Sequence, residues 1–284
     1  MLHQENIRSI HKNLSSIYSF GTILFGGSYL YGEAEEASDL DFYLISNFRW
    51  FLNYIRHKEL LKEIKEKNPT VQLMLVPGIF FRRGWYYIYG RDNHGDIKIS
   101  KINKKVIFRN SLKLACFHYL RFLLSNEPAD KRKYLIKSAQ QAAVAAIIRG
   151  GAEKLDPSAP LFSQKTIKEN LEKYDGKYKE VVGRILDWKT EEANPDINSL
   201  NQAGRQLLGV ITDVFDNAGS LMSFLPINHF IYNFKFLLRG NREFLFHNPD
   251  KLLLKKVING IKTSINLEEL YQEMKETIFP VFII

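Results

Sequence analysis

Cysteine is almost absent from this sequence: among 284 residues, Cys116 is the single one. One cysteine excludes an intrachain disulfide and any metal site built from several thiolates, and such usage is typical of a reducing cytoplasm. Cys116 lies in an apolar stretch between Leu112 and Phe117. We therefore expect a buried, unreactive thiol rather than a nucleophile.

Long apolar runs are also lacking. No segment approaches the roughly 18 consecutive residues that a membrane-spanning helix needs, so we expect no membrane among the partners. The opening residues, MLHQENIRSI, contain no apolar core of a secretory signal, and we expect a cytoplasmic protein. The apolar tail 278–284 is too short to span a membrane, and we expect it to dock onto the protein's own core.

Several catalytic signatures are missing as well. The sequence contains no G-x-x-x-x-G-K-[ST] phosphate loop and no G-x-S-x-G nucleophile elbow, so nothing supports a P-loop ATPase, a kinase or a serine hydrolase. Its seven histidines show no metal-ligand spacing. Internal repeats and low-complexity tracts are absent too, so the chemistry has to be sought in a local motif.

The overall composition is that of a globular protein, with 45% hydrophobic and 25% charged residues. The formal net charge is +9 and the pI is about 9.3. A basic balance favours anionic partners such as nucleotides, nucleic acid or acidic membranes. The alternative interpretation is a solvated, lysine-rich surface without a specific partner.

The first hundred residues predict strands separated by helices. Helical spacing is found over 4–17 and 50–67, and short apolar strands are predicted over 22–25, 40–45 and 71–76. A hairpin is predicted from 85–89 and 96–100, across the turn residues 92–95. This part of the chain therefore reads as an α/β domain over 1–105.

After about residue 106 the pattern becomes helical. Helices are predicted over 108–125, 130–149, 166–174, 177–190, 196–216, 227–239, 249–262 and 266–277. A loop with two prolines is predicted over 151–164. The expected fold class is α+β, with a mixed sheet and flanking helices over 1–105 and a helical domain over 106–284.

The most informative motif joins a glycine turn to two carboxylates. Gly26-Gly27-Ser28 follows an apolar run, and such a turn can present backbone N–H groups to a phosphate. Ten residues after Ser28 come Asp39 and Asp41, which point the same way on a strand and can hold divalent cations. Their apolar flanks favour a metal site, because two like charges at the head of a buried strand repel each other.

The pattern Gly-Ser, ten residues, Asp-x-Asp, framed by a strand on each side, resembles the nucleotidyltransferase superfamily. That group includes DNA polymerase beta, and the minimal and antibiotic-modifying branches are most similar in pattern. The resemblance covers about residues 21–76, and the helices that follow the first domain are similar to the layout of the antibiotic-modifying enzymes. It implies a nucleotidyltransferase-type mixed sheet.

The resemblance also implies roles for individual residues. Asp39 and Asp41 would hold Mg²⁺ and act as catalytic residues, and NMP would pass from an NTP to a hydroxyl acceptor while pyrophosphate leaves. The acceptor would be a small molecule, a protein or an RNA end. The nucleotide-binding residues would be Gly26, Gly27, Ser28, Ser38, Arg82 and Arg83.

One position departs from the family pattern. Active members usually carry a third carboxylate on a later strand, but the strand over 71–76 contains no acid, and Gln72 occupies the matching position. Three explanations stay open. Asp96 or Asp92 of the following hairpin supplies the acid, or two carboxylates suffice with Gln72 as a neutral ligand. In the third, the chain is a weakened module that binds nucleotide, RNA or a protein partner.

A basic segment over 82–113 is the second notable feature. It holds nine basic and two acidic residues, a net charge of +7, and aromatic residues interleave with the charges over 80–89. Basic and aromatic side chains together suit phosphate contacts and base stacking, which makes RNA a candidate partner. The other interpretation is a half-buried hairpin with aromatic residues in the core and solvated lysines. A homodimer is also compatible with the sequence.

Overall fold

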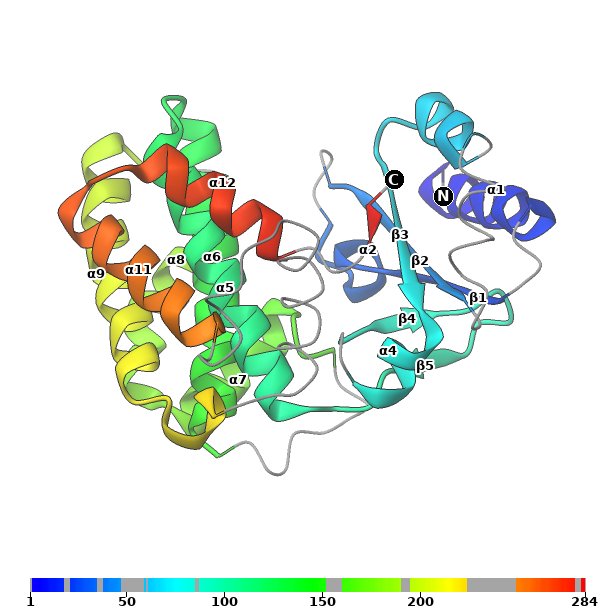
Figure 1. Ribbon diagram of the computed structural model, residues 1–284. Helices are drawn as coiled ribbons and strands as arrows, with labels where there is room; N and C mark the ends of the chain where they lie inside the picture. Colours follow the sequence, from blue (N-terminus) through cyan, green and yellow to red (C-terminus); the bar gives the residue numbers. More distant parts are fainter. Residues whose placement is uncertain are drawn as a thin grey trace, which may run out of the picture. The chain divides into compact units, whose positions relative to one another are not determined.

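The structure is a computed structural model of the chain, drawn in Figure 1. It describes residues 2–17, 21–34, 38–46, 59, 61–84, 87–151, 160–189, 195–223, 249–278 and 282–283. The chain divides into two compact units. Unit 1 consists of Met1–Val106, Asp156–Ser163 and Val281–Ile284, and unit 2 consists of Ile107–Leu155 and Gln164–Pro280.

Unit 1 is built on a six-stranded mixed sheet in the order β5-β4-β1-β2-β3-β6 (Figure 1). β2 and β3 run parallel, whereas all other neighbouring pairs are antiparallel. The strands are β1 (Gly21–Gly26), β2 (Leu40–Ser46), β3 (Val71–Pro77), β4 (Tyr89–Arg91), β5 (Ile97–Ile99) and β6 (Phe282–Ile283). The expected α+β class with a mixed sheet is thus confirmed.

Alternating side chains give the sheet two apolar faces. On one face Leu40, Phe42 and Leu44 of β2 join a core with α1 (Leu2–Ile17) and with residues 61–67, which are helical. On the other face a smaller core includes Ile45 and Ile88. Two short helices complete unit 1, namely α2 (Ser28–Tyr31) after β1 and α4 (Gly78–Arg83) after β3.

The sequence places the elements of unit 1 well. All three main strands are found where they are predicted, and the tail returns to the sheet as expected, because β6 pairs with Met74 and Leu75 of β3. The hairpin is present, but its first strand, β4, overlaps the predicted strand 85–89 only at Tyr89. The helix α4 is missed, because Pro77-Gly78 reads only as the end of a strand. Most of the predicted helix 50–67 lies outside the described residues.

Unit 2 is helical, as expected. Its elements are α5 (Lys104–Leu124, which begins in unit 1), α6 (Pro128–Arg149), α7 (Gln164–Tyr174), η1 (Gly176–Tyr178), α8 (Lys179–Asp187), α9 (Ile197–Asp216), η2 (Gly219–Met222), α11 (Pro249–Thr263) and α12 (Leu267–Ile278). The predicted helix 227–239 lies outside the described residues. The predicted boundary after residue 105 lies beside the division at Val106, but 156–163 and 281–284 belong to unit 1 rather than to the second domain.

The core of unit 2 is formed by α5 and α6, whose inward residues are almost fully buried. Cys116 is among them, and burial raises the pKa of its thiol to about 12, so the expectation of a buried cysteine is confirmed. Within the part of the chain that the structure describes, no helix has the length and apolar character that crossing a membrane requires.

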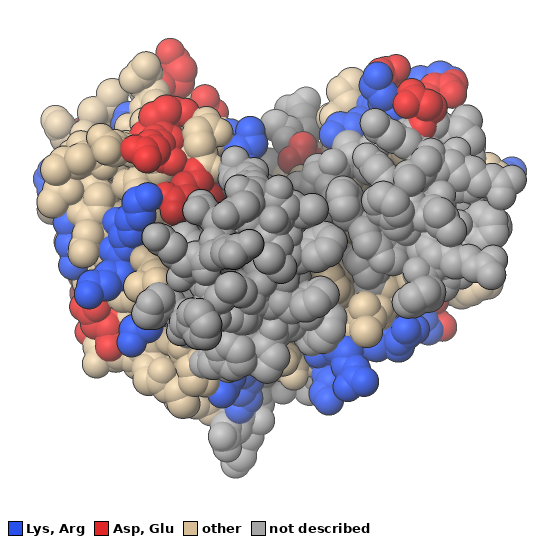
Figure 2. Space-filling view, viewed as in Figure 1, with Lys and Arg blue, Asp and Glu red and all other residues tan. Residues whose placement is uncertain are grey.

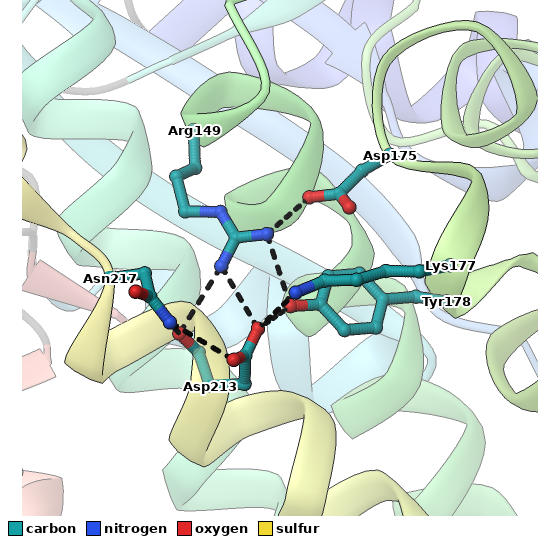
Figure 3. A network of polar contacts seen from close by, with 6 residues as sticks. All are labelled: Arg149, Asp175, Lys177, Tyr178, Asp213 and Asn217. Atoms are coloured by element: carbon teal, nitrogen blue, oxygen red, sulfur yellow. Dashed lines mark hydrogen bonds and ion pairs between the residues drawn. The ribbon is translucent and has the colours of Figure 1, made fainter.

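A polar network ties three elements of unit 2 together (Figure 3). Arg149, at the end of α6, donates to Asp175 at 2.5 Å and to the carboxylate of Asp213 on α9 at 3.2 Å. Lys177 and Tyr178 of η1 donate to the same Asp213 oxygen. Hydrogen bonds from these two side chains, and from Arg149, hold the pKa of Asp213 well below its usual range. We infer a stabilising role, because the charges of the network are matched by partners within it.

The buried imidazole of His118 on α5 is expected to make the stability of unit 2 fall at acidic pH. The ring stacks on Tyr134, with 6.5 Å between ring centroids, and its buried Nδ1 lacks a hydrogen-bond partner among the described residues. Burial, and then the charges of Lys137 and Arg121, lower the pKa of His118 to about 3. The unfolded chain takes up a proton near pH 6.5, whereas the folded chain does so only near pH 3. Stability contributed above pH 6.5 is therefore lost as the pH falls.

The expected result is a loss on the order of 1–2 kcal/mol between pH 6.5 and 5 that depends on His118. Urea unfolding of the wild type and of His118→Gln at both pH values measures it, and the variant should lose less stability. Equal losses in the two proteins would contradict the assignment.

Candidate functional site

The glycine turn stands at the end of β1. β1 ends at Gly26, and Gly27 is the residue that caps the N-terminus of α2, with φ 75° and ψ −164°. These dihedral angles belong to a region that essentially only glycine occupies. The carbonyl oxygen of Gly27 accepts from Leu30 at 3.0 Å, which closes the turn into a helical start. The predicted strand-to-helix turn is therefore present, and its conformation requires glycine.

Asp41 lies directly against this turn. β1 and β2 run antiparallel, and their register sets Gly26 opposite Asp41. A Cβ atom added to Gly27 would stand 2.0 Å from Oδ2 of Asp41. The carboxylate therefore occupies the space that a side chain at position 27 would need. Two segments that the sequence motif joins only by spacing are thus in contact.

Asp39, Asp41 and Gln72 share one side of the sheet. Asp41 alternates with Leu40 and Phe42, which face the α1 side, so it points to the opposite side, and Asp39, two residues earlier, has the same parity. The parallel register pairs Asp41 with Gln72 on β3. Asp39 is exposed, while Asp41 and Gln72 are half-buried. The amide thus stands beside the carboxylate, at the position where the resemblance described above would imply an acid.

The structure does not bring Asp96 or Asp92 to these carboxylates. β5, which begins just after Asp96, is three strands from β2, so at about 4.8 Å per strand the separation is roughly 14 Å. Asp96 instead pairs with Lys98 at 3.2 Å, and Asp92 accepts backbone N–H groups within its own turn. Among the described residues, no three His, Cys, Asp or Glu side chains are arranged to hold a metal ion. The prediction that Asp96 or Asp92 of the hairpin supplies the third carboxylate is therefore wrong.

Of the other predicted nucleotide contacts, Ser38 adjoins the carboxylates in the sequence, whereas the arginines lie away from them. Ser38 directly precedes Asp39. Arg82 lies on α4, which starts beside Ser46 at the far end of β2, five residues or roughly 16 Å from Asp41. Arg83 follows on the same short helix, and both are exposed. The sequence does not show this separation, because it does not tell at which end of the sheet α4 begins.

Three tyrosines lie near Asp41, and only two of them stand out in the sequence. The ring of Tyr31 on α2 meets that of Tyr89 on β4 edge-on, with 6.0 Å between centroids. Burial chiefly raises the pKa of Tyr31, and Tyr87 and Asp41 act in the same direction. The phenol of Tyr31 therefore stays protonated at neutral pH. Tyr87 and Tyr89 belong to the aromatic run noted in the basic segment, whereas nothing in the sequence singles out Tyr31.

The basic segment 82–113 is not one surface. Arg109 and Lys113 are buried in unit 2 and pair with Asp250. Lys98 is neutralised by Asp92 and Asp96. Figure 2 shows the Lys and Arg side chains spread over several places on the face in view, rather than gathered in one patch. The net charge of the segment therefore overstates the positive surface available to RNA.

The donor set that remains is two carboxylates, one amide and a glycine turn. Proteins commonly bind Mg²⁺ through one or two carboxylates plus substrate phosphates, without a cage of protein ligands. Asp39 and Asp41, with Gln72 beside them, fit that mode of binding, whereas they do not make a closed metal site. Comparison of the chain with family models, with curated proteins and with solved structures finds no match.

Proposed function

We propose that the chain is a Mg²⁺-dependent nucleotidyltransferase that moves NMP from an NTP to a hydroxyl acceptor. The observation that carries this proposal is the contact between Gly27 and Asp41, in which a Cβ would lie 2.0 Å from the carboxylate. With the backbone this close, N–H groups that can meet a phosphate and a carboxylate that can hold a metal would lie within one ligand's reach. A structural turn would not need its glycine to contact an acid.

The residues of the site would have different roles. Bound Mg²⁺ would neutralise the phosphates and favour in-line attack of the acceptor hydroxyl. Asp39 and Asp41 would hold it, while Gly27 and Ser28 present backbone N–H groups and a hydroxyl to the triphosphate. Gln72 carries no charge and cannot take the proton of the acceptor, but its oxygen accepts a hydrogen bond and so orients a water molecule.

Calorimetric titration of each NTP, with and without Mg²⁺, tests the proposal. We expect Mg²⁺-dependent binding to the wild type that falls at least about tenfold in Asp39→Asn and in Asp41→Asn, since each loses a charged ligand. Asp96→Asn is the matched control, and it should bind like the wild type. A wild type that binds no NTP in the presence of Mg²⁺ would contradict the proposal.

The second candidate is a module that binds a nucleotide, an RNA or a protein partner without transfer. It is favoured by Gln72 at the family's acid position and by the lack of a three-acid cluster in the described part of the chain. Pyrophosphate release from NTP that Asp41→Asn abolishes supports the enzyme. An RNA complex that is salt-dependent, needs no metal and survives Asp41→Asn supports the module.

A further inference from the structure

A cavity lies on the opposite side of β1 from the carboxylates. It has a volume of about 640 Å³, and its apolar floor is formed by Ile7, Phe25, Tyr29 and Leu30. Phe25 belongs to the core on the α1 face, whereas Asp41 points to the other face of the sheet. Sites for small molecules commonly measure about 300–1,000 Å³ and are lined mainly by apolar and aromatic side chains. The cavity therefore has the size and floor of a ligand site.

Its rim is positively charged. Arg8 and Lys12 stand one turn apart on α1 and so share a helix face, and Arg91 lines the other wall. Among the residues that the structure describes, no carboxylate forms an ion pair with any of these three. Three cations around one apolar floor favour an anionic ligand.

Among the residues of the lining that the structure describes, Asp92 is the carboxylate, and it is held by donors of its own hairpin. Asp92 accepts the backbone N–H groups of His94 at 2.9 Å and of Asp96 at 3.0 Å, and its other oxygen lies 3.5 Å from Lys98 Nζ. Although burial works against it, these hydrogen bonds and the Lys98 charge lower the pKa of Asp92. Its negative charge is thus offset in part by these donors and by Lys98, which also lies 3.2 Å from Asp96.

The imidazole of His11 forms part of the wall. Its Nε2 lies 3.3 Å from the carbonyl oxygen of Ile23, which can only accept, so we assign the proton to Nε2. Nδ1 then accepts from the hydroxyl of Ser15 at 3.2 Å. With both nitrogens used, the ring presents an aromatic surface to the cavity.

We propose that this cavity binds a small phosphorylated molecule with an aromatic body. The ring would lie on Phe25 and Tyr29, and the phosphate would meet Arg8, Lys12 and Arg91, since arginine pairs with phosphate through two parallel hydrogen bonds. The proposal is independent of nucleotidyl transfer, because none of the residues that carry it belongs to the carboxylate site.

Calorimetry with phenyl phosphate, in EDTA and without Mg²⁺, tests the proposal. We expect binding to the wild type and to Asp41→Asn alike, and binding at least about tenfold weaker in the double variant Arg8→Gln/Lys12→Gln. Inorganic phosphate and benzyl alcohol, which carry one part of the ligand each, should bind at least about tenfold more weakly than phenyl phosphate. The matched control is Lys62→Gln/Lys67→Gln, which removes two exposed cations elsewhere in unit 1 and should leave affinity within about twofold.

Three results would overturn the proposal: no binding to the wild type, unchanged binding in Arg8→Gln/Lys12→Gln, or an equal loss in the control, which would indicate only general attraction. Thermal melting checks that each variant folds. Should the α1 variant fail to fold, Arg91→Gln on the opposite wall takes its place. Arg91→Gln should weaken the binding of phenyl phosphate by about fivefold or more, and unchanged binding in this variant overturns the proposal as well.

Discussion

Asp250→Ala is expected to lower the free energy of unfolding of unit 2 by about 3–5 kcal/mol, because it removes the buried carboxylate that pairs with two buried cations. Arg109 and Asp250 are 1% and 0% exposed, and Lys113 is 6% exposed. The carboxylate lies 3.4 Å from Arg109 Nη1 and 3.1 Å from Lys113 Nζ. Burial lowers the pKa of Arg109 while Asp250 opposes that shift, so removing the carboxylate leaves burial uncompensated.

Urea unfolding of the full chain measures the loss, with Asp187→Ala as the matched control. Asp187 pairs with Lys168, but both side chains are more than 40% exposed, and exposed pairs contribute about 0–1 kcal/mol. The triple variant Arg109→Met/Lys113→Met/Asp250→Leu removes all three charges and should recover much of the stability. A loss in Asp250→Ala no larger than in Asp187→Ala would show that the buried group is not coupled as the distances indicate.

This buried group also marks the limit of the sequence analysis. Arg109 and Lys113 read as part of a basic surface because their partner, Asp250, comes 141 and 137 residues later in the chain. Helical spacing predicts that a helix exists over this region, but it does not tell which of its charges turn inward. Tertiary packing decides which distant residues pair, and local sequence patterns do not predict that packing.

The carboxylate site was more predictable because its information is local. Gly27 directly follows β1, and Asp41 lies on β2, the next strand in the sequence. The motif spacing therefore predicts that the turn and the acids belong to one site, whereas the antiparallel pairing that brings them into contact is seen only in the structure. Asp96 was wrongly considered for the same site, since the sequence does not give the order of strands in the sheet. That order places β4 and β5 on the far side of β1 from β2. The strands themselves are readable from the sequence, whereas their order and register are not.

Gly27→Ala is expected to weaken Mg²⁺-dependent NTP binding at least about a hundredfold. Alanine is strained at φ 75° and ψ −164° by about 1–3 kcal/mol. Its Cβ would also stand 2.0 Å from Asp41 Oδ2, so the carboxylate has to move from the turn. A displacement on the order of 1 Å at a site of this kind is enough for an effect of that size. The titration used for Asp41→Asn measures it.

Gly32→Ala provides the matched control. Gly32 has a similar φ of 73°, but an added Cβ would meet nothing within 4 Å. The Gly32→Ala variant has the conformational cost of a positive φ but no clash. Its affinity for NTP should therefore stay within about threefold of the wild type. If Gly32→Ala weakens binding as much as Gly27→Ala does, then backbone strain in the turn, and not contact with the carboxylate, decides affinity.

A double-mutant cycle separates the contact from the proposed activity. In the Asp41→Ala background the carboxylate is gone, so Gly27→Ala should cost less stability there than in the wild type, by about 1 kcal/mol or more. The remaining cost would be the strain of the backbone and a tight contact with the Cβ atom of residue 41 at 3.2 Å. Additive losses in urea unfolding would mean that Gly27 and Asp41 are not in contact. Because this readout needs no ligand, it tests the geometry of the site even if the chain transfers nothing.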